Sequence, residues 1–144
     1  MAGYFRKAEA FNYVGSEKAG ETLANGEFVS ITAANGVKKL TAAGDAEFRV
    51  TEKTSLWGLP AIVMVCVIPG DKENYVVENE FEDYGVGDFD YATYTVPTGH
   101  YVKMRRPNIN DELIISVDST TYAALSVGDT VKPAIGGGVA KKSA

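Results

Sequence analysis

Cysteine is almost absent from this chain of 144 residues, in which Cys66 is the only one. A single cysteine excludes an intrachain disulfide framework and a zinc site built from several cysteine ligands. Cys66 lies inside the apolar run AIVMVCVI. A buried and unreactive thiol is expected there, because a reactive one needs a cationic or basic neighbour.

Long apolar runs and basic clusters are also missing. The longest apolar run, Leu59 to Pro69, is about half of what a membrane-spanning helix requires. The first fifteen residues carry scattered charges and lack the apolar core of a signal peptide. The formal net charge is -5, and the largest basic cluster is Lys103, Arg105 and Arg106. We therefore expect a soluble chain that binds neither membranes nor nucleic acid.

Residues for catalysis are few. His100 is the only histidine, so a serine or cysteine nucleophile would have to use it as its base, and no G-x-S-x-G turn is present. The glycines Gly136 to Gly138 lack the following Lys-Ser/Thr and helix of a phosphate loop. We expect no enzymatic activity, no catalytic residue and no cofactor, with His100 an ordinary residue at the start of a strand.

Short alternating runs and fifteen glycines dominate what is present. Two strand-like runs, Glu27 to Thr32 and Val37 to Thr41, flank an Asn35-Gly36 pair that suits a tight hairpin turn. In AEFRVTEKT, Phe48 and Val50 fall on one face and charged residues on the other, which is typical of a half-buried strand. The valine-rich run AIVMVCVI predicts a central strand covered on both faces.

These runs predict an all-β fold, a single-domain β-sandwich or barrel of about eight strands. The β domain is expected over residues 21–135. Residues 1–20 are predicted to be an N-terminal arm or a first strand, and residues 136–144 a flexible Gly/Lys tail. The segment DSTTYAAL predicts one helical turn capped by Asp118 or Ser119.

An acidic run, YVVENEFEDYGVGDFDY, extends from Tyr75 to Tyr91. In a strand, Glu78, Glu80 and Glu82 share one face. A calcium site around Asp83, Asp88 and Asp90 is conceivable, but the run lacks the spacing of an EF-hand. We expect no metal site, but a solvated acidic face or an edge strand protected by charge.

Aromatic residues are concentrated in and after the same run. They suit a ligand-binding face or the core of a sandwich, and we expect Tyr84 and Tyr91 to be more exposed than Phe81 or Phe89.

From about Thr95 onward, the chain reads TVPTGHYVKMRRPNINDELIISVDSTTYAALSVGDTVKPAIGGGV. This third of the chain resembles the C-terminal portion of capsid decoration (cement) proteins of tailed bacteriophages, in which strands are linked by turns such as VGDTV at Val127 to Val131. The resemblance implies a non-enzymatic structural protein on the exterior of the virion. Its partner would be the major capsid protein, and it would self-associate on the capsid lattice, for which a trimer is one option.

The resemblance implies a contact with the shell, and we expect the N-terminal segment to provide it, because aromatic residues and arginine are the usual anchors of protein interfaces. The predicted partner-binding residues are Tyr4, Phe5, Arg6, Phe11, Tyr13, Tyr84 and Tyr91. The alternative for the N-terminal segment is a strand of the domain's own sheet. The alternative function is a stand-alone carbohydrate- or ligand-binding β module with tyrosines as its platform.

Overall fold

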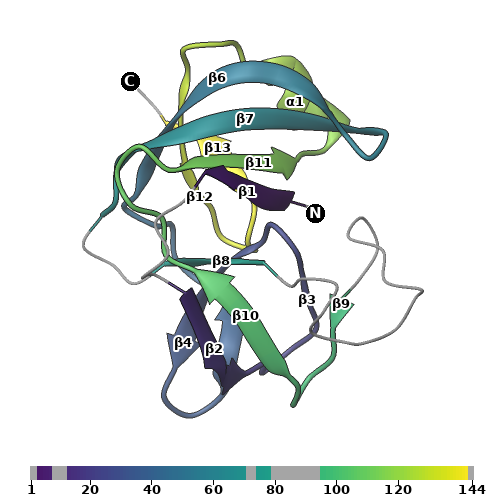
Figure 1. The fold of residues 1–144 in the computed structure, drawn as a ribbon, viewed down its shortest axis with the longest axis vertical. Helices are drawn as coiled ribbons and strands as arrows, with labels where there is room; N and C mark the ends of the chain where they lie inside the picture. The colour runs from purple at the N-terminus through teal and green to yellow at the C-terminus, as the bar shows by residue number, and fades with distance from the viewer. Residues whose placement is uncertain (1–2, 8–12, 71–73, 79–94, 143–144) are drawn as a thin grey trace.

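The chain folds almost entirely into β-strands. The computed structural model describes residues 3–7, 13–70, 74–78 and 95–142, which form thirteen strands in three antiparallel sheets and one short helix (Figure 1). The all-β prediction is confirmed. The described residues contain thirteen strands where about eight were expected.

The larger sheet has six strands in the order β1-β11-β7-β6-β12-β13. Its strands are β1 (Gly3–Lys7), β11 (Glu112–Ser116), β7 (Leu59–Ile68), β6 (Glu47–Leu56), β12 (Thr130–Pro133) and β13 (Val139–Lys141). The run AIVMVCVI forms the inner strand β7, where Ala61 to Met64 are buried on both faces, as predicted. In β6, Phe48 and Val50 point into the core and Arg49 is exposed, which confirms the alternation.

The second sheet has five strands in the order β2-β10-β8-β4-β5. They are β2 (Tyr13–Lys18), β10 (Tyr101–Arg105), β8 (Tyr75–Val77), β4 (Phe28–Thr32) and β5 (Gly36–Lys39), and a separate pair joins β3 (Leu23–Ala24) to β9 (Thr95–Val96). The predicted hairpin is confirmed, since β4 pairs antiparallel with β5 and Gly36 has a φ of 75°.

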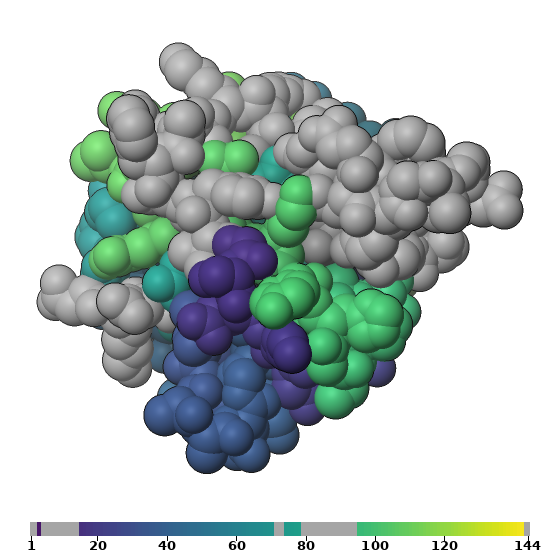
Figure 2. Space-filling model, turned by 60° about the horizontal axis from the view of Figure 1, so that its bottom comes forward, coloured from purple at the N-terminus to yellow at the C-terminus, as the bar shows by residue number. Residues whose placement is uncertain are grey.

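The five-stranded sheet curls until its two outer strands meet. A bridge joins Ala19, just after β2, to Val37 of β5, and the N–H of Gly20 donates to the carbonyl of Val37 over 2.8 Å. A Cβ atom at Gly20 would collide with the carbonyl of Asn35, so glycine is required at this seam. Figure 2 shows this face, where the purple, blue and green segments lie side by side although they are far apart in the sequence. The five strands therefore form a small barrel.

Strands β4 and β8 each face two cores. Phe28 and Val76 are cross-strand partners and belong to the cluster under the six-stranded sheet, where the rings of Phe28 and Phe48 are 5.6 Å apart. Their neighbours Val29 and Tyr75 are also partners, but they belong to the cluster inside the barrel. Because side chains alternate along a strand, this one layer separates and joins the two cores.

Both ends of the chain contribute strands to the sheets. The first twenty residues contain two strands, β1 in the larger sheet and β2 in the barrel, so they do not form a single arm. The predicted flexible tail is wrong for Val139–Lys141, which form β13 paired with β12. The glycines before β13 supply a turn whose residues Gly136 and Gly137 have φ near 90°. The segment that was predicted to be a tail therefore contains the second strand of the β12–β13 hairpin.

The predicted helical turn is confirmed as α1 (Ser119–Ala124). Asp118 is its N-cap, and the side chain accepts a hydrogen bond from the N–H of Thr121.

Candidate functional site

The tip of the β6–β7 hairpin has an unusual backbone for its residues. Leu56 and Leu59 are paired, so only Trp57 and Gly58 form the turn. Their φ angles are 49° and 80°. A two-residue turn with positive φ at both positions normally holds Asn-Gly, because asparagine and glycine tolerate the left-handed region. A tryptophan there costs roughly 1–2 kcal/mol of backbone strain.

The same tip presents apolar surface to solvent. Trp57, the only tryptophan of the chain, is 46% exposed, and Leu59 beside it is 40% exposed. A Cβ atom at Gly58 would meet nothing within 4 Å, so the turn projects into open space. Beneath it lies a small buried cluster of Leu56, Ala61, Val63 and Ile114, which anchors the hairpin to its sheet. The fold thus exposes about half of the Trp57 side chain at the tip of a paired hairpin.

The N-terminal residues predicted to bind a partner are divided between the two sheets. Tyr4 and Phe5 lie in β1 opposite Ile114 and Leu113, and Arg6 lies at the irregularity of that pairing. Tyr13 begins β2 and lies opposite Arg105. This matches the alternative that the segment is part of the domain's own sheets. The side chains of these four residues, and the whole of Phe11, Tyr84 and Tyr91, lie outside the described residues.

Only the first carboxylate of the acidic run is described, and it is not on a solvated face. Arg105 Nε donates to Glu78 Oε2 over 2.9 Å, and the two side chains are only 15% and 11% exposed. The expectation of a solvated face is therefore wrong for Glu78, which joins β8 to β10. The calcium candidates Asp83, Asp88 and Asp90 lie outside the described residues. Within residues 3–7, 13–70, 74–78 and 95–142, no three His, Cys, Asp or Glu side chains form a group that could hold a metal ion.

Cys66 and His100 have the environments that the sequence indicates. Cys66 is fully buried, and burial, reinforced by the negative charge of Asp111, raises the pKa of its thiol to about 11. The thiol is therefore protonated at neutral pH, whereas a nucleophilic cysteine needs a thiolate. His100 is exposed just before β10, and its carbonyl accepts from the N–H of Ala19.

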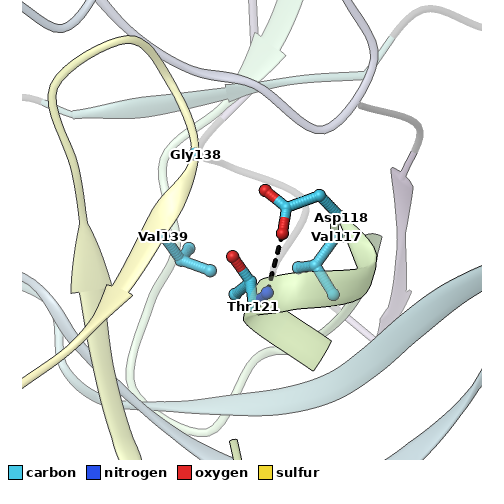
Figure 3. Close-up of a pocket in the computed structure, with 5 residues that line it drawn as sticks. All are labelled: Val117, Asp118, Thr121, Gly138 and Val139. Atoms are coloured by element: carbon cyan, nitrogen blue, oxygen red, sulfur yellow. Dashed lines mark hydrogen bonds between the residues drawn. The ribbon is translucent and has the colours of Figure 1, made fainter. Parts of the chain in front are cut away.

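A small pocket of about 130 Å³ lies between the start of α1 and the turn before β13 (Figure 3). It is lined by Val117, Asp118, Thr121, Gly138 and Val139. The only carboxylate among these residues belongs to Asp118, which is engaged by the N–H of Thr121 over 2.7 Å. This hydrogen bond lowers the pKa of Asp118. A carboxylate engaged in capping is a poor candidate for acid or base chemistry.

Sequence reasoning missed the hairpin tip. Its signal was the Trp57-Gly58 pair between two strand-like runs, which has the same X-Gly form as the Asn35-Gly36 turn. Asparagine is typical of such a turn, whereas tryptophan is not, so the sequence pattern did not predict a turn at Trp57.

The described residues contain no helix that is both long and apolar enough to cross a membrane. No protein-family model matches this chain, and searches of curated proteins and of solved structures also found no match.

Proposed function

We propose that this protein is a non-enzymatic decoration protein. It binds the outer surface of an assembled tailed-phage capsid, bridges major capsid subunits and self-associates on the capsid lattice. The major capsid protein is proposed as the partner because residues from Thr95 onward resemble capsid decoration proteins. The observation that carries a binding role is the exposed and strained Trp57 at the tip of the β6–β7 hairpin.

Trp57 supports the proposal in two ways, through the strain of its backbone and through the nature of its side chain. Strain at a bulky residue costs stability, and such strain is concentrated at functional sites. Tryptophan is also enriched among the few residues that carry most of the energy of a protein interface. The partly exposed side chains of Trp57 and Leu59 suit an apolar pocket on the shell, since a hairpin whose strands are already paired loses little entropy on docking.

The stabilising mechanism is mass action. A ligand that binds the assembled shell and not its free subunits lowers the free energy of the shell by its binding energy. Each copy makes a small contact, and the repetition of that contact over the lattice gives avidity.

The test is co-sedimentation of the purified chain with empty, expanded capsids, in its natural form and as Trp57→Asn. We expect the substitution to weaken capsid binding about 30-fold, which corresponds to a typical hot spot of about 2 kcal/mol. The isolated variant should melt at the same temperature or a few degrees higher, because asparagine relieves the strained turn. Loss of binding with gain of stability separates a docking role from a structural one.

The matched control is Val127→Asn, which changes another exposed apolar residue before a glycine, at a position without positive φ. It should leave capsid binding unchanged. If the natural chain fails to sediment with capsids or to raise their melting temperature, the decoration function is wrong. If it binds and Trp57→Asn binds equally well, the function stands and Trp57 is not its anchor.

A further inference from the structure

A groove of about 600 Å³ lies beside the β12–β13 hairpin, the yellow outer part of the six-stranded sheet in Figure 1. Its lining combines apolar and basic residues and consists of Ala43, Lys132, Pro133, Ala134, Ile135, Ala140, Lys141 and Lys142. Ile135 is 70% exposed, the highest value among the exposed large apolar side chains of the described residues. The groove therefore offers an uncovered apolar surface.

The charge of the groove is opposite to that of the chain. Three of the eight lining residues are lysines and none is acidic, whereas the chain has a net charge of -5. Lys142 Nζ is 3.0 Å from Glu47 Oε1, and Lys141 Nζ is 3.5 Å from Asp129 Oδ2. Within the described part of the chain, Lys132 has no such carboxylate partner. Electrostatic complementarity therefore favours an acidic partner.

The edge of β13 adds a backbone component. The N–H of Lys142 donates to Thr130, and the N–H of Ala134 donates to Gly138. Because ladder bonds alternate along an antiparallel pair, the N–H groups of Val139 and Lys141 point away from β12. An outer strand with N–H groups directed outward is the template to which an extended segment adds as a further strand.

The chain itself contains a segment with the matching chemistry. Residues 79–91 lie outside the described residues, and their sequence is NEFEDYGVGDFDY. This sequence has five carboxylates, no lysine or arginine, and four aromatic residues placed between the acids. The acids suit the lysines of the groove, and the aromatic rings suit its apolar lining residues and Ile135.

We propose that the groove beside β13 binds residues 79–91 of a second copy of the chain, laid along β13 as an additional strand. The contact joins different surfaces of the two copies, so it can be exchanged reciprocally in a pair or repeated from copy to copy. Each contact is weak in solution and is reinforced when the copies are held side by side. Such self-contact rests on the proposed lattice role, but it is measured on the isolated chain, so it and capsid binding fail separately.

The first measurement uses a fluorescent synthetic peptide with the sequence of residues 79–91 and follows its anisotropy as the full chain is added at low salt. We expect saturable binding that weakens about tenfold or more with Lys132→Glu, and that also weakens as salt is raised. The matched control is Lys38→Glu, which reverses a lysine on β5, away from the groove. A second control is a peptide with its Glu and Asp replaced by Gln and Asn, which should not bind.

The second measurement is sedimentation velocity of the full chain over a range of concentrations. Lys132→Glu and the double variant Glu80→Lys/Glu82→Lys should each lose self-association, and a mixture of the two should regain it. Equal binding of the peptide by the natural chain and by Lys132→Glu would overturn the proposal, as would a monomer that binds no peptide at low salt. The natural chain could stay monomeric and fail to bind the peptide while the double variant binds it. That result would mean that each chain's own segment occupies its groove, and it would overturn the second copy as occupant.

Discussion

The six-stranded sheet and the five-stranded barrel differ in the length of the strands at their centres. The centre of the larger sheet is one hairpin, β6 and β7, with ten residues in each strand and a turn of two residues. The barrel is built from strands of three to six residues, and its closure brings Ala19 against Val37. The β6–β7 centre of the larger sheet is specified by local sequence, whereas the barrel closes only when the residue after β2 meets β5.

The core of the larger sheet also contains more buried side chains than the core of the barrel. Among the described residues, the cluster under the larger sheet contains fourteen buried side chains, including both Phe28 and Phe48. The cluster inside the barrel contains nine, mostly valine and other small or medium apolar residues. The barrel supplies Phe28 and Val76 to the larger cluster, so the larger half depends on the barrel for part of its core. Four experiments follow, from the largest expected effect to the smallest, and the first three test this comparison.

Phe28→Ala should have the largest effect, because Phe28 is fully buried and lies on the strand that both cores share. We expect a loss of about 4 kcal/mol in the free energy of unfolding, from lost burial and from the cavity left behind. The measurement is urea unfolding followed by circular dichroism. Phe28→Leu should lose much less, since it retains most of the apolar volume. A loss below about 1.5 kcal/mol for Phe28→Ala would contradict a shared core.

Met64→Ala and Met104→Ala form a matched pair, since both methionines are fully buried and each lies in one of the two cores. Each should lose about 2–4 kcal/mol of unfolding free energy. They should differ in the rate at which iodoacetamide labels Cys66. This thiol lies in the cluster under the six-stranded sheet, so it becomes accessible only when that part of the molecule opens. Met64→Ala should speed labelling strongly and Met104→Ala should speed it little, as measured by mass spectrometry.

Labelling in this pair reports opening because the buried thiol, with its pKa of about 11, is protonated and shielded in the native state. Equal acceleration by both substitutions would mean that the two halves open as one unit.

Gly20→Ala tests the barrel seam. The added methyl group would collide with the Asn35 carbonyl, so the seam must shift or open, at a cost of roughly 1–3 kcal/mol. Hydrogen exchange should show faster exchange at Gly20, whose N–H donates across the seam to the carbonyl of Val37, while β6 and β7 stay protected. Ser16→Ala on the exposed part of β2 is the control and should be nearly neutral. Unchanged exchange at the seam in Gly20→Ala would refute the barrel closure.

Asp118→Asn should have the smallest effect, since asparagine also caps helices well. Hydrogen bonding to Thr121 lowers the pKa of Asp118 below its ordinary value of 3.8. The stability from this charge is therefore present above pH 3.8 and is lost as the pH falls through the lowered pKa of the folded state. The melting temperature of the natural chain should exceed that of the variant above pH 3.8, and the difference should shrink below it. A difference that does not vary with pH would contradict this assignment.

Features fixed by neighbouring residues could be predicted from the sequence. The β4–β5 hairpin follows from Asn35-Gly36, the faces of β6 from alternation, the burial of β7 from its valine-rich run, and α1 from its cap at Asp118. What could not be predicted was pairing across the chain. Nothing near Tyr4 or Tyr13 indicates that one strand joins β11 and the other β10, because the partners lie about a hundred residues away.

The candidate site was missed for a different physical reason. Trp57 has a positive φ that tryptophan rarely adopts, so rules based on the residue preferences of turns do not predict a turn there. Glu78 was misjudged because its neighbours in sequence are acidic, while its neighbour in space is Arg105 on another strand.

The placement of β1 also affects how the chain folds while it is being made. Gly3 pairs with Ile115, so the partner of the first strand leaves the ribosome more than a hundred residues later. At a synthesis rate of roughly 5–20 residues per second, β1 waits about 5–20 s without its partner. Meanwhile the β4–β5 and β6–β7 hairpins can form from neighbouring segments as soon as they emerge. Translation speed and chaperone occupancy over the first hundred residues should therefore affect the yield of folded protein more than any event at the end of synthesis.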